Sequence, residues 1–326
     1  MTPGQKRLAW ALVAFGAAAG AAAALVRAKT RRAERENPPR GQFIFVQGVK
    51  LHYVDRGVGQ PVVLLHGNGA LAQDFDLSGV LDIAAQRYRV IAFDRPGYGY
   101  STRPRSRVWT PEAQAQVVYE ALARLGVERP IVVGHSWGTL VALALALLHP
   151  AEVKSLVLMS GYYFPTVRLD VPVMSAAAVP VLGDLLRYTF SPLLGRLLWP
   201  ALAKRLFGPA PVPRRFAAFP KWLSLRPSQL RAAAVEAALL VPSAAALSRR
   251  YSELQTPAIV LAGAGDRYVS AEHSKRLHER LPQSVLRIVP ATGHMFHYLW
   301  PRKVVAAIDQ AASGLKPLSA REAITR

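Results

Sequence analysis

Gly134-His135-Ser136-Trp137-Gly138 is the stretch of sequence that decides the fold. The apolar, β-branched residues 131–133 before it predict a buried strand, and the apolar residues 139–145 after it predict a helix. A Gly-x-Ser-x-Gly turn between a strand and a helix holds its serine on a tight bend, because glycines fit where side chains would collide. The bend lifts the hydroxyl out of the sheet and directs N–H groups of the helix start toward a nearby oxyanion. We therefore predict that Ser136 is a nucleophile.

The composition indicates a folded, core-forming protein. The chain has 326 residues, of which 51% are hydrophobic and 19% charged, so it is long enough for one large α/β domain with an insertion. It has no cysteine, which excludes disulfides, a thiol nucleophile and thiolate metal sites. The net charge of +21 is not organised into a basic arm, an aromatic RNA platform or a helix-turn-helix pattern. We therefore expect no nucleic-acid partner.

The N-terminus carries an uncharged run at residues 8–26, close to the length that crosses a bilayer as a helix. Two basic residues precede the run, and a denser basic cluster follows it at residues 27–35. By the positive-inside rule, this asymmetry places the catalytic domain on the cytoplasmic side. We predict a single-pass membrane anchor at residues 1–30. A cleaved signal peptide, which would release a secreted protein, is the alternative.

The rest of the chain alternates short apolar strands with helices, which predicts a mostly parallel sheet covered by helices on both faces. The expected domain plan is a linker at 31–42, an α/β core at 43–161 and 251–315, a helical cap at 162–250 and a tail at 316–326. The expected strands lie at 43–46, 50–55, 62–65, 88–93, 131–133, 153–159, 258–262 and 285–289. The expected helices lie at 111–125, 139–148, 271–281 and 301–312.

The cap, inserted after the sixth strand, is rich in leucine and proline, with twelve basic and three acidic residues. Five of its leucines fall near one helical face: Leu194, Leu197, Leu198, Leu202 and Leu206. Our preferred interpretation is that this stripe packs onto the main domain. The alternative is that part of the cap rests on a membrane surface, as a basic amphipathic helix beside an anchor would.

A serine nucleophile needs a base that takes its proton and an acid that orients the base. Asp266 follows the strand at 258–262 on a glycine-rich loop, and His294 follows the strand at 285–289. Carboxyl ends of parallel strands meet at one edge of a sheet, so the order Ser136, Asp266, His294 predicts a catalytic triad. We interpret the nearby His297 as a packing residue.

An oxyanion hole needs two backbone donors. One is expected at Trp137, directly after the nucleophile. The other is expected at Asn68, in the His66-Gly67-Asn68-Gly69 turn that follows the strand at 62–65. Glycines on either side of Asn68 let the backbone come close to a substrate.

With these residues in view, the chain resembles the α/β-hydrolase fold superfamily, in the capped branch that contains esterases, haloperoxidase-like proteins, epoxide hydrolases and haloalkane dehalogenases. The matching stretches lie between residues 43 and 312: His66 to Gly69, Asp94-Arg95-Pro96-Gly97-Tyr98-Gly99-Tyr100-Ser101, Gly134 to Gly138, Gly265-Asp266 and Gly293-His294. The resemblance implies a triad hydrolase, and it makes residues 94–101 a structural loop beside the site.

The serine narrows the reaction. Asn68 with Trp137 looks like the halide-binding pair of haloalkane dehalogenases, but alkyl transfer to Ser136 would leave an ether that water does not cleave. The same objection excludes ordinary epoxide hydrolysis. A Ser-Trp-Gly elbow also resembles that of proline iminopeptidases, but those hold a substrate amine with acids, which this cap almost lacks. Acyl transfer to water remains, from an ester, a thioester, a lactone or a carbon–carbon bond next to a carbonyl.

We therefore predict a membrane-anchored serine hydrolase that cleaves carboxylic esters with apolar or amphiphilic acyl groups. Its partner is a small ester or lipid-like substrate, and the chemistry requires no metal or organic cofactor. Two enzymatic alternatives are a carbon–carbon bond hydrolase and a perhydrolase or haloperoxidase-like activity. An alternative of another class is a ligand-binding protein that keeps the fold with negligible turnover.

Overall fold

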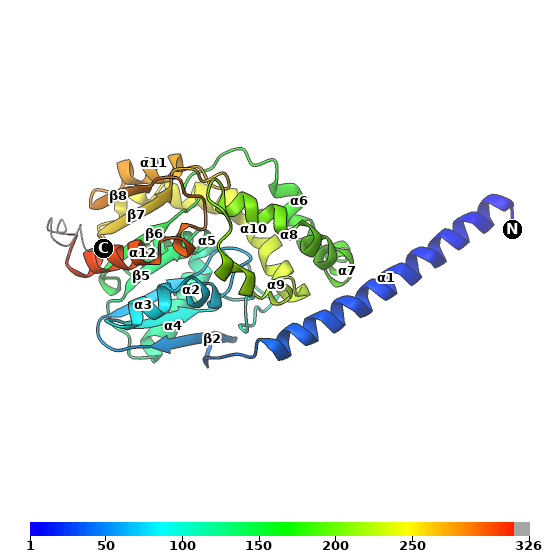
Figure 1. The fold of residues 1–326 in the computed structure, drawn as a ribbon, viewed down its shortest axis with the longest axis horizontal. Helices are drawn as coiled ribbons and strands as arrows, with labels where there is room; N and C mark the ends of the chain where they lie inside the picture. Colours follow the sequence, from blue (N-terminus) through cyan, green and yellow to red (C-terminus); the bar gives the residue numbers. More distant parts are fainter. Residues whose placement is uncertain (316–326) are drawn as a thin grey trace.

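A computed structural model describes residues 1–315 of the chain, and the predicted tail at 316–326 lies outside the described residues (Figure 1). The strands are β1 (Gln42–Val46), β2 (Val49–Arg56), β3 (Pro61–Leu65), β4 (Arg89–Phe93), β5 (Ile131–His135), β6 (Ser155–Met159), β7 (Ala258–Gly263) and β8 (Ser284–Val289). The α-helices are α1 (Pro3–Glu36), α2 (Gln73–Ser78), α3 (Val80–Ala85), α4 (Pro111–Arg124), α5 (Trp137–Leu148), α6 (Val171–Ser175), α7 (Leu182–Tyr188), α8 (Phe190–Phe207), α9 (Lys221–Ser224), α10 (Pro227–Ser248), α11 (Glu272–Arg280) and α12 (Pro301–Ala312). The 3₁₀ turns are η1 (Pro150–Glu152), η2 (Ala176–Ala178), η3 (Arg214–Ala218), η4 (Tyr251–Glu253) and η5 (Phe296–Tyr298).

Across residues 1–315 the eight strands form one sheet in the order β1-β2-β4-β3-β5-β6-β7-β8. The β1–β2 and β2–β4 pairs are antiparallel, and all later pairs are parallel. The predicted fold class, a mostly parallel sheet in an α/β domain, is confirmed. Two short helices, α2 and α3, were not predicted. They lie in the crossover that parallel strands require between β3 and β4.

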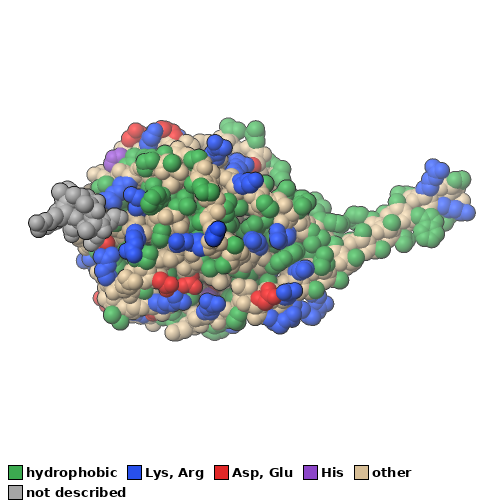
Figure 2. All heavy atoms as spheres, in the orientation of Figure 1, with side chains coloured by type: hydrophobic (Ala, Val, Ile, Leu, Met, Phe, Trp, Pro, Cys, Tyr) green, Lys and Arg blue, Asp and Glu red, His purple; other side chains and the backbone are tan. Residues whose placement is uncertain are grey.

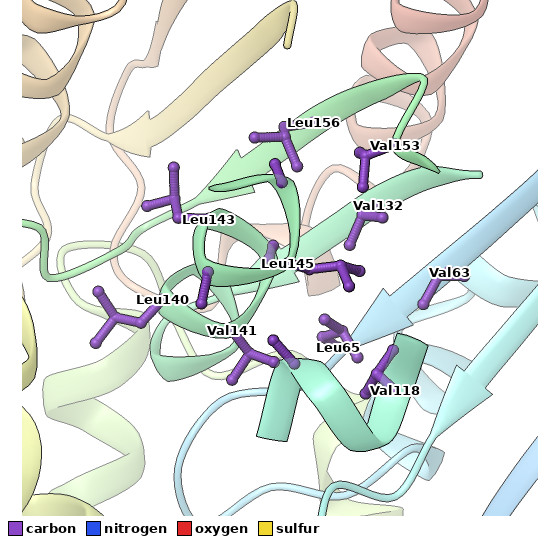
Figure 3. Close-up of a cluster of buried hydrophobic side chains, with 14 of the residues drawn as sticks. Val63, Leu65, Val118, Val132, Leu140, Val141, Leu143, Leu145, Val153 and Leu156 are labelled. Atoms are coloured by element: carbon purple, nitrogen blue, oxygen red, sulfur yellow. The ribbon is translucent and has the colours of Figure 1, made fainter. Parts of the chain in front are cut away.

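Helices cover both faces of the sheet because successive residues of each buried strand point to opposite sides. Val63 and Leu65 of β3 pack in one cluster with side chains of α4, α5 and α11 (Figure 3). Val62 and Leu64 of the same strand pack in the opposite cluster with α2, α3 and α12. The uninterrupted apolar character of these strands therefore reflects a sheet that is buried on both sides.

Between β6 and β7 the chain forms the helices α6 to α10, where the sequence predicts a cap. Figure 1 shows these helices gathered on the side of the molecule from which α1 departs. The preferred interpretation of the leucine stripe is wrong. On α8, Leu194, Leu197, Leu198 and Leu202 are 55%, 74%, 53% and 41% exposed, and of the five leucines Leu206 packs into the core. Helical periodicity located the stripe correctly, but it did not indicate whether the leucines are buried against the rest of the protein.

Helix α1 is longer than the predicted anchor, because it continues through six residues of the expected linker and ends at Glu36. Alanine, arginine and glutamate favour a helix, and Arg32 pairs with Glu36 one turn later at 2.6 Å. The chain breaks only at Asn37, before two prolines. By length and composition, α1 is a candidate membrane span, and 6% of its apolar window is buried in the protein.

Candidate active site

Ser136 lies at the junction of β5 and α5 in a strained backbone conformation, with φ 52° and ψ −120°. A non-glycine residue in this region persists only where its surroundings impose it. Here the imposing feature is close packing: a Cβ atom on Gly134 would lie 2.6 Å from the Gly138 carbonyl oxygen, and one on Gly138 would collide with the Leu65 carbonyl. The two glycines of the motif are therefore needed to bring strand and helix together around the serine.

Asp266 and His294, from the loops after β7 and β8, form a buried pair. The imidazole Nδ1 of His294 donates to Oδ2 of Asp266 at 2.8 Å. The other carboxylate oxygen of Asp266 accepts the backbone N–H groups of Tyr268 and Val269, at 2.8 and 2.9 Å. Because the Nδ1 proton is engaged with the acid, the Nε2 lone pair of His294 is the one available to act as a base.

His135 connects the loop of His294 to the turn that carries Ser136. Its Nε2 donates to the backbone oxygen of His294 at 3.0 Å, and the two rings lie 5.0 Å apart. Burial, together with His297 and His294, holds the pKa of His135 well below its usual value, so the ring is neutral. This second histidine lies inside the motif itself, yet its contact with a residue 159 positions away has no signal in the sequence.

The predicted oxyanion residues lie beside the nucleophile. Asn68 and Trp137 line the same pocket as Ser136, and a Cβ atom on Gly67 would lie 3.0 Å from Cβ of Ser136. The side-chain amide of Asn68 donates to the Ala233 carbonyl of α10 at 2.9 Å, so it is bound to the cap. Because its side-chain amide is engaged, Asn68 is expected to contribute its backbone N–H to the oxyanion hole. The same bond means that the amide does not form a halide-binding pair with the Trp137 indole.

The pocket above Ser136 is enclosed largely by the cap. Apolar walls come from Val171 and Met174 of α6 and from Ala237 and Leu240 of α10. The charged and tyrosine residues of the lining are Tyr162, Arg168, Glu236 and Tyr268. The ring of Tyr268 also packs 5.0 Å from that of His294, so the pocket and the base share a wall.

Glu236 is an acid that lines the same pocket as Ser136 and that sequence reasoning did not assign to the site. It is fully buried, and its carboxylate receives Arg95 at 2.6 Å, Arg103 at 3.5 Å and the Tyr98 hydroxyl at 2.6 Å. Burial by itself would raise the pKa of Glu236, but the two guanidinium groups lower it, so the carboxylate is ionised. Because this charge is already compensated, it does not offer the free acid that a substrate amine requires.

Arg95 also shapes the turn at 66–69. Its Nε donates to the His66 carbonyl at 2.8 Å, and its backbone N–H donates to Nε2 of His66 at 3.0 Å. Burial lowers the pKa of His66 to about 4, and the nearby Arg95 acts in the same direction. A neutral His66 accepting from Arg95 therefore holds the loop that carries Asn68.

A family model of the alpha/beta hydrolase fold matches residues 60–300. The match includes all five residues of the predicted triad and oxyanion hole. The chain belongs to the α/β-hydrolase family.

A curated relative of this α/β-hydrolase matches part of the chain. The chain is 35% identical over 135 residues to a 2-hydroxymuconate semialdehyde hydrolase of Pseudomonas putida, covering 41% of this chain and 48% of the relative. The matched part thus spans about half the length of that relative.

Solved structures with the same fold cover more of the chain. An esterase of Exiguobacterium antarcticum has a TM-score of 0.68 and 21% identity, covering 83% of this chain and 99% of that one. A bacterial membrane phospholipase A has a TM-score of 0.62 and 23% identity, covering 96% of this chain and 100% of that one. At these identities the likeness shows the fold.

Behind the site of this hydrolase, Asp74, His135 and His297 bring potential metal-ligand atoms within 4.8 Å of one another. Both carboxylate oxygens of Asp74 already accept hydrogen bonds, from Nε2 of His297 at 3.0 Å and from the Tyr298 hydroxyl at 2.7 Å. We therefore interpret the cluster as buried packing beneath the catalytic loops, which agrees with the packing role expected for His297.

Proposed function

We propose that this α/β-hydrolase is a serine hydrolase that cleaves carboxylic esters with apolar or amphiphilic acyl groups. The observation that carries the proposal is the buried Asp266–His294 pair, tied through His135 to a serine held at positive φ. A strained serine, together with a histidine whose Nδ1 is engaged by an acid, supports an activated nucleophile.

In the proposed reaction, Oγ of Ser136 attacks the ester carbonyl while Nε2 of His294 takes the hydroxyl proton. Asp266 keeps His294 in the Nδ1-protonated tautomer and stabilises the imidazolium that forms. The backbone N–H groups of Trp137 and Asn68 stabilise the oxyanion. His294 then donates its proton to the leaving alcohol, and water hydrolyses the acyl-enzyme by the reverse sequence.

The pocket favours an acyl group over a charged amine. Val171, Met174 and Leu240 offer an apolar wall, and Glu236, the acid in the same lining, is neutralised by Arg95. A second candidate is hydrolysis of a carbon–carbon bond next to a carbonyl. It is supported by the local similarity to the semialdehyde hydrolase, and it would use the same serine.

The test is hydrolysis of p-nitrophenyl esters of short and medium acyl chains, with carbon–carbon substrates and peracid formation assayed in parallel. We expect Ser136→Ala to lose on the order of 10⁶ in kcat, as removal of a triad nucleophile does. Ser160→Ala is the matched control, because Ser160 also has a positive φ (50°), is buried and does not line the pocket.

Equal rates for wild type and Ser136→Ala would refute the assignment. If a fluorophosphonate labels Ser136 but no ester is hydrolysed, Ser136 remains the nucleophile, and the carbon–carbon substrates become the favoured ones. A ligand that raises the melting temperature without any product or labelling would favour the binding-protein alternative.

We also propose that α1 anchors this enzyme in a membrane, with the catalytic domain on the cytoplasmic side. The exposed apolar surface of α1 supports the anchor, and the basic residues that follow it support the orientation. The fold likeness to the membrane phospholipase A also extends over most of the chain, including part of α1.

A further inference from the structure

The cap exposes an apolar face across α6, α7 and α8. Its exposed members include Val173 (80%), Val181 (82%), Leu182 (51%), Tyr188 (51%), Leu194 (55%), Leu197 (74%) and Leu198 (53%). We call these three helices with the intervening residues the cap face. Figure 2 shows hydrophobic side chains on the surface where α1 extends away from the globular part of the molecule. Apolar surface gathered in this way marks a site of protein, ligand or membrane contact.

The cap face lies directly beside the predicted membrane span. Helix α1 packs against α7, α8 and α9, and the rings of Phe15 and Phe190 lie 6.1 Å apart. Phe15 is in the middle of the apolar run, twelve residues before the first basic residue of the following cluster, Arg27. At 1.5 Å per residue, the start of α8 is level with a point about 18 Å along α1 from Arg27. One leaflet contributes about 15 Å of hydrocarbon, so an α1 that spans a bilayer carries this contact to about the middle of the bilayer.

The charges of α7 fit a lipid environment, whereas α8 also carries three exposed basic residues, Arg196, Lys204 and Arg205. Helix α7 carries Asp184 and Arg187, which pair with each other, and Asp184 also receives Arg105 at 3.3 Å. The guanidinium of Arg187 donates in addition to the Ala177 carbonyl at 3.1 Å. Paired charges are those that a low-dielectric medium tolerates. Residues 171–178 and 182–188 are together long and apolar enough for a span, but they bend by 93°, as a broken span or a re-entrant element does.

The same segment forms a wall of the active-site pocket. Val171 and Met174 of α6 line the pocket beside Ser136, whereas Val173, between them, is among the most exposed residues of the cap. One turn of helix therefore separates the pocket from the cap face.

We propose that the cap face inserts into the lipid leaflet beside α1, so that the pocket of Ser136 receives its acyl chain directly from the bilayer. Insertion rests on the cap face and on the proposed membrane span of α1, whereas delivery of the acyl chain rests on the proposed ester hydrolysis. Continuity with α1 favours lipid over a second copy of the chain as the occupant, because any membrane that holds the middle of α1 also surrounds its neighbour α8.

Insertion can be tested in the full chain, because it has no native cysteine and a single introduced one can be labelled selectively. Val173→Cys and Leu197→Cys carry a fluorophore, and Val58→Cys is the control. Val58 is equally exposed (82%) but lies in the turn between β2 and β3, at the end of the sheet opposite Ser136. In vesicles of mixed neutral and anionic phospholipid, nitroxide-labelled lipid should quench both cap labels, and aqueous iodide should quench the Val58 label.

Iodide quenching of the cap labels to the same extent as the Val58 label would overturn insertion. Cap labels shielded from iodide yet not quenched by the lipid nitroxide would also overturn it, because a second copy of the chain would then cover the face. Neither readout requires turnover, so this experiment stands even if esters are not the substrate.

Delivery from the bilayer is tested with the double variant Leu182→Glu/Leu197→Glu, against Val58→Glu/Val108→Glu as a charge-matched control. For an ester embedded in vesicles, we expect the cap variant to lose on the order of tenfold or more in rate, because glutamates oppose insertion. Its rate on a water-soluble short ester should stay within about twofold of wild type. Equal losses on both esters, or none on either, would overturn delivery. A wild type inactive on every ester would instead refute the proposed function and leave insertion to the quenching result.

Discussion

At the scale of single residues, the site depends on backbone strain that only close packing maintains. Ser136 has φ 52°, and the surrounding glycines let β5, α5 and the turn at 66–69 approach it. Strain of this kind costs on the order of 1–3 kcal/mol and is retained where function uses it.

This strain predicts an unusual order of stability for two inactive variants. Ser136→Gly should be more stable than Ser136→Ala by about 1 kcal/mol, because glycine relieves the strain by more than its extra unfolded-state entropy costs. Chemical denaturation of both proteins in detergent measures the difference. At Ser274, inside α11, the same pair of substitutions should show the opposite order, with alanine more stable. An alanine variant at 136 that equals or exceeds the glycine variant would contradict the strain.

Sequence patterns located the candidate nucleophile, base and acid because each follows a strand in a short local motif. The residues that hold these three in place could not be predicted from the sequence. Glu236 lies 141 residues from Arg95, and a lone acid in a helix is ordinarily a surface residue. In the sequence, Glu236 stands out only as one of the few acids in a basic cap. Its burial in contact with two arginines is a property of the folded chain.

At the scale of elements, the cap helix α10 is joined to the loop after β4 by the buried pair of Glu236 and Arg95. Removing one member of a buried pair leaves the other charge uncompensated in a low-dielectric interior. The pair therefore fixes the cap over the pocket as well as the turn that carries Asn68.

Glu236→Gln should lower the free energy of unfolding by about 3 kcal/mol, because it leaves Arg95 and Arg103 without a full counter-charge. The matched control is Glu253→Gln, which breaks the exposed Arg250–Glu253 pair (2.8 Å) and should cost less than about 1 kcal/mol. Denaturant titration of both variants provides the comparison. Similar small losses would mean that the buried pair contributes little to holding the cap.

Helix α8 shows what periodicity can and cannot predict. The leucines were correctly placed on one face, because a period of 3.6 residues is written in the sequence. The direction of that face depends on how α7, α8 and α1 pack together, and this packing turned four of the leucines outward. The short helices α2 and α3 were missed for a different reason, because six residues are too few for a periodic signal.

At the scale of the whole molecule, the basic residues after the apolar run predict the orientation of α1. In a bacterial inner membrane, Gly4→Cys should react with an impermeant maleimide from outside intact cells. Ser313→Cys should react only after the membrane is opened, because the proposed orientation puts the catalytic domain on the cytoplasmic side. The opposite pattern would reverse the topology. An intact mass lacking the first residues would instead support the signal-peptide alternative.

The sequence by itself determined the α/β architecture, the position of the helical insertion, the apolar N-terminal run and the candidate triad with its oxyanion donors. Each of these is encoded by local order: hydrophobic period, glycine spacing, or a polar residue at the end of a strand. Only the tertiary structure decided that Glu236 is neutralised by Arg95, that His135 ties the base to the elbow, and that the leucines of α8 face outward beside α1. Those contacts join residues far apart in the chain, and their energies depend on burial, which no local pattern records.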